Sequence, residues 1–277
     1  MKSITILYHN DLDGFGAAWS AWKKFGSKAD YLAVDFGEPM PAGLKNKEIY
    51  ILDFSYPEAE LKALLENNKK LVLIDHHITS KDKVKILKEY VWDIKHSGCV
   101  LSWKYFHLGK KIPKLIEYVE GIDLFSFKLK NTREITLFLE TLPRDFKLWN
   151  KVVSGMENKG KFSEYLKAGE IIAGFMDKII EIIASNFQDA IFEGKKVSVV
   201  NSPIFNSELG GYLLKKIKNP IAVIWSAKNG EIRVSLRSSK QVDVSKIAQK
   251  YGGGGHKQAA GFYLDARQQI PWKIINE

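Results

Sequence analysis

The feature that most constrains the fold is an alternation of short apolar runs with amphipathic runs along the first 77 residues of the 277-residue chain. The apolar runs at 3–9, 49–55 and 71–77 have the length and composition of buried strands. Segments 13–26 and 56–70 have helical periodicity, with Gly26 suited to end the first helix and Pro57 near the start of the second. Strands alternating with helices favour βαβ units, so we expect an α/β fold with a mainly parallel sheet flanked by helices.

All three apolar runs end in acidic or imidazole side chains. These are His9, Asp11 and Asp13 after the first run, Asp53 after the second, and Asp75 and His76 after the third. In an open α/β sheet the carboxyl ends of parallel strands border the same crevice, so we expect these side chains to converge. A turn or helix cap explains any one of them equally well, but three in succession favour a shared site.

A metal site is the chemistry that such a cluster indicates. In LVLIDHHITS, residues 71–80, a carboxylate and two imidazoles follow a buried run directly, which is costly unless a partner pairs with them. Oxygen and imidazole ligands suit manganese or magnesium, with manganese favoured by the histidines. The number of carboxylates suggests two ions, and a pair roughly 3.5–4 Å apart stabilises both the attacking and the leaving oxygen in phosphoryl displacement.

The remaining composition limits the class of protein. The single cysteine, Cys99, excludes an internal disulfide and a multi-cysteine zinc site, fits a reducing cytosol, and is expected to be a small packed residue. A net charge of +10 favours acidic partners such as phosphates or nucleic acid. We expect no signal peptide, and no membrane span, because Asp177, Lys178 and Glu181 interrupt the most hydrophobic long stretch, the amphipathic helix expected over 169–187. A cytoplasmic location follows.

Four motifs in order resemble one known family. HNDLDG at 9–14, ILDFS at 51–55 and IDHH at 74–77 resemble the first three motifs of the DHH phosphoesterase superfamily. GGGGHKQAAG at 252–261 resembles the signature of the C-terminal domain associated with that superfamily. The resemblance implies a catalytic domain over 1–187, including the connecting amphipathic helix, and a smaller α/β substrate-binding domain over 188–277, across a cleft.

The same resemblance implies a role for each matching residue of the N-terminal half. One ion would be held by His9, Asp11 and Asp53, and the other by Asp13, Asp53, His76 and Asp123. Asp123, in EGIDLFSF, is assigned to the fourth motif, with a helix-capping or surface aspartate as the alternative. The catalytic assignments are Asp75, which would orient ligands beside the cluster, and His77, which would face the substrate phosphate as a donor or proton shuttle.

The C-terminal segment has a second α/β pattern, in which Asn229-Gly230 suits a tight hairpin turn. Its glycine run is not a P-loop, since no Gly-Lys-Ser/Thr follows, and a close-approach loop fits better than a flexible linker. The resemblance implies that His256 and Arg237 contact the substrate, although an exposed strand residue is the alternative for Arg237. The substrate-binding residues expected from the motif and its neighbours are Arg237, Ser238, Gly253, Gly254, Gly255, His256 and Lys257.

The function implied by the resemblance is a manganese-dependent phosphodiesterase that releases 5′-mononucleotides from short oligonucleotides, of the nano-RNase (oligoribonuclease) type in the RecJ-type branch. Two divalent cations are expected, Mn²⁺ first and Mg²⁺ as the alternative. A 3′-phosphoadenosine 5′-phosphate phosphatase, a linear or cyclic dinucleotide phosphodiesterase and a non-catalytic nucleotide-binding protein stay open.

The partner expected is a short oligonucleotide or a nucleotide, with no membrane, no disulfide-linked partner, and a homodimer compatible with the sequence. Aromatic residues at helical spacing are expected to be core rather than base-stacking platforms. They are Trp19, Trp22, Trp103, Tyr105 and Phe106.

Overall fold

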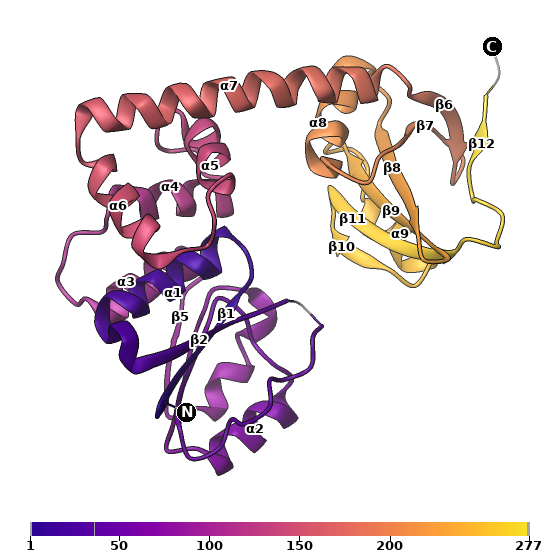
Figure 1. Cartoon of the computed structure of the whole chain (residues 1–277). Helices are drawn as coiled ribbons and strands as arrows, with labels where there is room; N and C mark the ends of the chain where they lie inside the picture. Colours follow the sequence, from indigo (N-terminus) through magenta and orange to yellow (C-terminus); the bar gives the residue numbers. More distant parts are fainter. Residues whose placement is uncertain (1, 36, 276–277) are drawn as a thin grey trace. The chain divides into compact units, whose positions relative to one another are not determined.

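The computed structural model describes residues 2–35 and 37–275 of the chain. It consists of two compact units, Met1–Ala173 and Gly174–Glu277, shown in Figure 1. The division between them falls inside the long helix α7, Lys159–Ala184. Our domain boundary at residue 187 lies just after the end of the same helix and stays a prediction.

The first unit contains a five-stranded parallel sheet in the order β2-β1-β3-β4-β5. Its strands are β1 Ile4–His9, β2 Ala29–Val34, β3 Glu48–Leu52, β4 Lys70–Asp75 and β5 Glu89–Trp92. The three central strands are β1, β3 and β4, and their consecutive residues are buried because helices cover both faces of the sheet. The expected parallel sheet is confirmed.

Alternate residues of the central strands enter two separate cores. On one face Ile6, Leu52 and Ile74 pack with helices α1, α3, α4, α5 and α6, and on the other Leu7, Ile51 and Leu73 pack with helix α2 and the short 3-10 helix Lys83–Ile86. The helices are α1 Leu12–Phe25, α2 Glu58–Asn67, α3 Gly98–Phe106, α4 Lys114–Asp123, α5 Thr132–Glu140 and α6 Phe146–Met156. The 3-10 helices of the described residues are Gly26–Lys28, Ile78–Ser80 and Lys83–Ile86.

The aromatic residues at helical spacing belong to the first of these cores. The rings of Trp19 and Trp103 stack with their centroids 5.5 Å apart, and Phe106 is buried with them. Trp22 and Tyr105 are partly buried against the same core, so the prediction that these five residues pack rather than stack on bases is confirmed. Cys99 is also fully buried, as expected.

The second unit is built on a seven-stranded sheet in the order β10-β11-β9-β8-β7-β6-β12. Only the β7–β8 pair is parallel among the described strands of this sheet. The strands are β6 Gln188–Phe192, β7 Lys195–Asn201, β8 Ile221–Lys228, β9 Glu231–Ser238, β10 Gly254–His256, β11 Ala259–Asp265 and β12 Lys273–Ile274. Asn229 and Gly230 form the expected two-residue hairpin turn, both with positive φ, of 53° and 82°.

Two helices cover opposite faces of this second sheet. Helix α9, Val244–Lys250, packs its Val244 and Ile247 against Val234 and Leu236 of β9. Helix α8, Asn206–Lys216, lies on the other face, where Gly210 abuts Arg237 and Ile224. None of the helices in the described part of the chain combines the length and hydrophobicity needed to cross a membrane.

Candidate metal centre

The first two acidic residues of the cluster are placed by the start of helix α1. Asp11 is the N-cap of α1, and its Oδ1 accepts a hydrogen bond of 2.8 Å from the Gly14 amide. Asp13 is buried in the first turn. A Cβ at position 14 would lie 2.1 Å from the His9 carbonyl oxygen, so glycine is required for α1 to begin this close to β1.

Asp53 follows β3 in the left-handed backbone region, with φ of 66°. Its amide donates to the Ile74 carbonyl at 2.8 Å, and only 1% of the residue is exposed. The start of helix α3 presses against it, because a Cβ at Gly98 would lie 2.6 Å from Asp53 Oδ1. The carboxylate is therefore enclosed by β3, β4 and α3.

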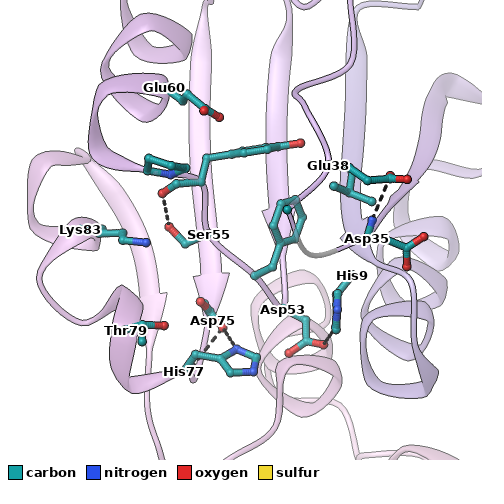
Figure 2. A pocket seen from close by; sticks show the side chains of 15 residues that line it. His9, Asp35, Glu38, Asp53, Ser55, Glu60, Asp75, His77, Thr79 and Lys83 are labelled. Carbon is teal, nitrogen blue, oxygen red and sulfur yellow. Dashed lines mark hydrogen bonds and ion pairs between the residues drawn. The ribbon is translucent and has the colours of Figure 1, made fainter. Parts of the chain in front are cut away.

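The end of β4 supplies the next group of ligands. Asp75 is fully buried, and its Oδ1 accepts hydrogen bonds from the His76 amide at 2.7 Å, the His77 amide at 3.2 Å and the His77 Nδ1 at 2.7 Å. Figure 2 shows the Asp75–His77 pair beside Asp53 and His9. Asp75 thus fixes both the backbone turn and the orientation of the His77 ring.

The metal-ligand candidates converge as expected. His76 Nε2 lies 3.3 Å from Asp53 Oδ1, 3.5 Å from Asp123 Oδ2 and 3.9 Å from Asp13 Oδ2. His9 Nδ1 lies 2.8 Å from Asp11 Oδ2 and 3.8 Å from Asp53 Oδ2. The two oxygens of Asp53 therefore face two different imidazoles, which is the arrangement that a carboxylate shared between two ions requires.

Asp123 belongs to this cluster rather than to the surface. It is the last residue of α4, where the negative end of the helix dipole disfavours a carboxylate. Its Oδ2 nevertheless points at His76, at the 3.5 Å given above. Three overlapping groups of candidate ligand atoms result among the described residues, each with all members within 4.8 Å of one another. They are His9, Asp11 and Asp53; Asp13, His76 and Asp123; and Asp53, Asp75, His76 and His77.

Five atoms of the cluster are buried without a hydrogen-bond partner in the described part of the chain. Three of them converge, since His76 Nε2 lies close to Asp53 Oδ1 and Asp123 Oδ2, and the other two are His9 Nδ1 and Asp75 Oδ2. Leaving such groups unpaired costs free energy, and buried polar atoms in folded proteins are nearly always satisfied. A divalent cation would pair with the unpartnered atoms of Asp53, His76 and Asp123 together, so these residues fit a metal ion.

The electrostatics of the cluster point the same way. Burial, followed by the nearby carboxylates of Asp13 and Asp11, raises the pKa of Asp53 well above its ordinary value and that of Asp123 to about 7. Burial lowers the pKa of His76, which leaves the neutral imidazole that a metal ion needs. A bound dication reverses the penalty on the acids, because its charge favours the ionised carboxylates.

Asp75 and His77 form an ion pair beside these ligands. Burial acts to raise the pKa of Asp75, but the hydrogen bonds from His77 and Ser80 outweigh it, so this pKa is lowered. The hydrogen bond from Asp75 raises the pKa of His77. His77 is half exposed, and it is well suited to donate a proton to an anionic ligand.

Sequence reasoning missed the groups that hold Asp13. Its two oxygens accept from the backbone amides of Gly98 at 2.6 Å and Cys99 at 3.0 Å, at the N-terminus of α3. Glu120 in turn accepts from the Ser97 amide at 3.1 Å. The Ser97-Gly98 pair before a helical pattern is a signal for a helix start, but it carries no sign of which carboxylate the amides contact.

A cavity of about 460 Å³ opens beside the cluster (Figure 2). His9, Asp53, Asp75 and His77 line one part of it. Its other walls include Phe54, Tyr56, Pro57, Glu60 and Lys83. The candidate metal centre therefore opens on a cavity that can take a small ligand. Sequence reasoning did not predict these other walls of the cavity.

Several of the expected substrate-binding residues meet at a second cavity, of about 330 Å³, in the second unit. Arg237, Gly254 and Gly255 line it. The Arg237 guanidinium donates to Ser207 Oγ at 2.7 Å and to the Leu236 carbonyl at 2.9 Å, which holds it beside α8. His256 is exposed and is separated from Arg237 by one residue, Ala259, across the β10–β11–β9 register.

Other expected substrate-binding residues lie elsewhere. Ser238 is only 4% exposed, and its hydroxyl donates to the Val242 carbonyl at 2.7 Å, because it faces away from Arg237 on the strand. The Gly253 amide donates to the Ala248 carbonyl at 2.9 Å, so it ends α9 instead of facing a ligand. Lys257 is exposed, and its carbonyl accepts from the Val244 amide at 2.8 Å at the start of α9. Ser238 and Gly253 thus support the turn rather than line the cavity.

Fold and site together define a two-unit α/β protein whose first unit has a cluster suited to two divalent cations. The DHHA1 domain family matches residues 194–272. An uncharacterized protein of Acanthamoeba polyphaga mimivirus is 29% identical, over 98% of this chain and 70% of its own length. The oligoribonuclease NrnB of Bacillus subtilis is 26% identical, over 91% and 71%. A 3′,5′-cyclic-nucleotide phosphodiesterase of Helicobacter pylori is 22% identical, over 100% and 97%.

Solved structures share the fold of the whole chain. A pGpG-specific phosphodiesterase of Vibrio cholerae, 13% identical, covers 95% of this chain and 94% of its own with a TM-score of 0.56. RecJ of Thermus thermophilus in complex with Mn²⁺, 15% identical, covers 95% of this chain and 49% of its own with a TM-score of 0.53. The DHHA1 match over residues 194–272 and the relatives named as an oligoribonuclease and a phosphodiesterase support the membership of the DHH phosphoesterase superfamily that the motifs indicated.

Proposed function

We propose that this protein is a manganese-dependent phosphodiesterase that hydrolyses short oligonucleotides to 5′-mononucleotides. The observation that carries the proposal is the convergence of three buried ligand atoms without hydrogen-bond partners, on Asp53, His76 and Asp123, from three separate segments of the described chain. The relatives named as an oligoribonuclease and as a phosphodiesterase support the same class of reaction.

Each residue of the cluster would have a distinct role in the reaction. His9, Asp11 and Asp53 would hold one cation, and Asp13, Asp53, His76 and Asp123 the other. When bound, such a pair of ions lowers the pKa of water and stabilises the charge that develops on a phosphoryl group. Asp75 keeps the ring of His77 oriented, and the raised pKa of His77 supports its role as a proton donor to the substrate phosphate.

The second unit would hold the part of the substrate that does not react. Arg237, Gly254 and Gly255 line one cavity, where a guanidinium and the open space above Gly254 suit a phosphate, and His256 pairs with Ala259, which also lines it. The predicted cleft between the domains, the cytoplasmic location and a homodimer stay predictions.

The choice of substrate is tested with a manganese-supplemented panel, compared by kcat/KM. The panel contains 5′-phosphorylated dinucleotides, longer RNA and DNA, cyclic dinucleotides and 3′-phosphoadenosine 5′-phosphate. Short linear oligonucleotides should be the best substrates. Preferred turnover of a cyclic dinucleotide or of the bisphosphorylated adenosine would identify one of the alternatives. No turnover of any member would favour a nucleotide-binding protein.

The variant Asp53→Asn tests the metal assignment. Asparagine keeps the shape of the side chain and tolerates the left-handed backbone of this position, so the fold should persist. Activity should fall by more than about a hundredfold, because residues that merely orient metal ligands are already worth about 10–100-fold. Asp82→Asn, at an exposed ion pair with Lys85, is the matched control and should retain full activity. Normal turnover by Asp53→Asn, with its fold verified by circular dichroism, would refute the ligand set.

A further inference from the structure

The second cavity extends beyond the residues that the family motif accounts for. Strands β9 and β11 pair so that Arg237 lies opposite Ala259, Ser235 opposite Gly261, and Arg233 opposite Tyr263. Alternate residues of a strand share a face, so these three rows follow one another on the α8 side of the sheet, roughly 7 Å apart. The far row, Arg233 and Tyr263, lines the same cavity as Arg237.

The middle row, Ser235 and Gly261, has little side-chain bulk and forms a shallow surface between Arg237 and Arg233. Strand β10 extends this row, since Gly254 lies opposite Gly261. A Cβ at Gly254 would have no atom within 4 Å, which means that the space above the backbone is open. Ser235 is buried, so no large side chain separates Arg237 from Arg233 on this strand.

The two arginines face the cavity in different ways. Arg237 is held at α8 through Ser207, whereas the guanidinium of Arg233 has no hydrogen bond or ion pair with another described residue, and Arg233 is exposed. Burial lowers the pKa of Arg237, and the charge of Arg233 acts in the same direction, while Glu208 opposes it. Arg233 and Arg237 are four residues apart on one strand, so their Cα atoms are about 13 Å apart, and their long side chains can bring both guanidinium groups to neighbouring phosphates of one short oligonucleotide.

Tyr263 places an aromatic ring beside the second arginine. Its side chain is prominent on the surface, with 60% of the residue exposed. Strand β10 begins at Gly254, which lies opposite Gly261, so no residue of β10 pairs with Tyr263. An exposed ring next to a guanidinium is the usual platform for a base of single-stranded nucleic acid.

The row after Tyr263 ends the favourable surface. Glu231 lies opposite Asp265 there, and both are acidic. Arg267 binds Asp265, and Lys228 of β8 lies opposite Glu231. The two acids and two bases of this row carry no net charge, so a third phosphate would gain no net attraction there.

We propose that Arg233 and Tyr263 form a binding position for the next nucleotide of a single-stranded oligonucleotide whose neighbouring phosphate is held at Arg237. Tyr263 stacks on its base and Arg233 binds its phosphate. This binding position rests on the proposed function. It makes a trinucleotide a better substrate than a dinucleotide, and a tetranucleotide or longer chain gains nothing more from it.

The test uses the full chain with 5′-phosphorylated di-, tri- and tetranucleotides of one sequence and Mn²⁺. Tyr263→Ala should raise KM for the trinucleotide about tenfold, within the range of one lost base stack, and leave the dinucleotide unchanged. Arg233→Ala should act in the same direction and weaken the salt dependence of binding. Tyr263→Phe keeps the ring and should behave as wild type. Lys246→Ala, at an exposed position on α9, is the control.

Binding separates this proposal from the proposed function. Titration calorimetry in excess EDTA measures the Kd of each oligonucleotide without turnover. Wild type should bind the trinucleotide about tenfold more tightly than the dinucleotide, and Tyr263→Ala should lose that difference. Equal affinities of wild type for the two lengths, or equal losses for both in the variants, would overturn the position at Arg233 and Tyr263. Absence of all hydrolysis with this binding pattern intact would count against the proposed function alone.

Discussion

Asp53 concentrates the chemistry of the site in one side chain. It is buried, its backbone is in the left-handed region, and its two oxygens face His9 on one side and His76 on the other. Burial and four further aspartates raise its pKa, so the protein without metal carries an unfavourable accumulation of acids. Such a cluster is stable as a set of ions only when a cation is present.

The variant Asp123→Asn tests this accumulation on the protein stripped of metal. The folded pKa of Asp123, about 7, exceeds its ordinary value of 3.8, so its stabilising contribution is complete below pH about 4 and lost as the pH rises through 7. Asparagine does not ionise, so it avoids that loss. In EDTA, the variant should unfold a few degrees above wild type at pH 8, and the difference should shrink at pH 5.

Thermal unfolding of both proteins is measured at pH 5 and pH 8. Hydrolytic activity in Mn²⁺ is measured as well, and Asp123→Asn should have lost most of it. A variant that is less stable than wild type at pH 8 in EDTA would show that Asp123 is not under electrostatic strain.

The residue pattern by itself predicted the site residues that follow strands, whereas Asp123, at the end of helix α4, was assigned from the family resemblance. His9, Asp53 and His76 follow apolar runs in the sequence, and parallel strands bring their ends together. The contacts that hold Asp13, from the amides of Gly98 and Cys99, depend on the packing of α3 against α1. Backbone donors of this kind have no side-chain signature. The inward face of Ser238 likewise depends on the register of β9, which its neighbour Arg237 alone does not determine.

Among the elements, the glycine run at β10 has two distinct tasks. Gly253 lies where a Cβ would be 2.1 Å from the Gly261 carbonyl oxygen, whereas Gly254 has open space. Close packing therefore explains the first glycine, and access to the cavity explains the second.

The variants Gly253→Ala and Gly254→Ala separate these tasks. Gly253→Ala should destabilise the second unit by about 1–3 kcal/mol, as overpacking does. Gly254→Ala should leave stability nearly unchanged and raise KM, since its methyl group enters the cavity that Arg237 lines. Urea unfolding and steady-state kinetics measure the two effects. Equal destabilisation by both substitutions would mean that the cavity at β10 is not open.

The elements that the sequence patterns revealed are the ones buried on both faces. β1, β3 and β4 are continuous apolar runs because helices cover both sides of them. The edge strands β2 and β5 were missed, since eight of their ten residues are partly or fully exposed and their sequences, ADYLAV and EYVW, mix polar with apolar residues. β10 is only three residues, GGH, and becomes a strand through its pairing with β11.

Across the whole molecule, the two units have separate cores and separate cavities. The metal-ligand candidates all lie in Met1–Ala173, and Arg237, His256 and Tyr263 lie in Gly174–Glu277. The chain has a net charge of +10, so the acidic metal cluster is locally opposite in sign to the molecule that carries it. An excess of positive charge favours the approach of a polyanionic substrate, and bound cations complete that attraction at the site.

The most direct measurement is an anomalous difference map, at the manganese absorption edge, from crystals of the full chain soaked in Mn²⁺. Two peaks should appear in the first unit, one on each side of Asp53, with His9 and Asp11 at one and Asp13, His76 and Asp123 at the other. Asp53→Asn crystals should lose at least one of them. A single peak in wild type, or peaks away from Asp53, would contradict the two-cation site on which the proposed hydrolysis depends.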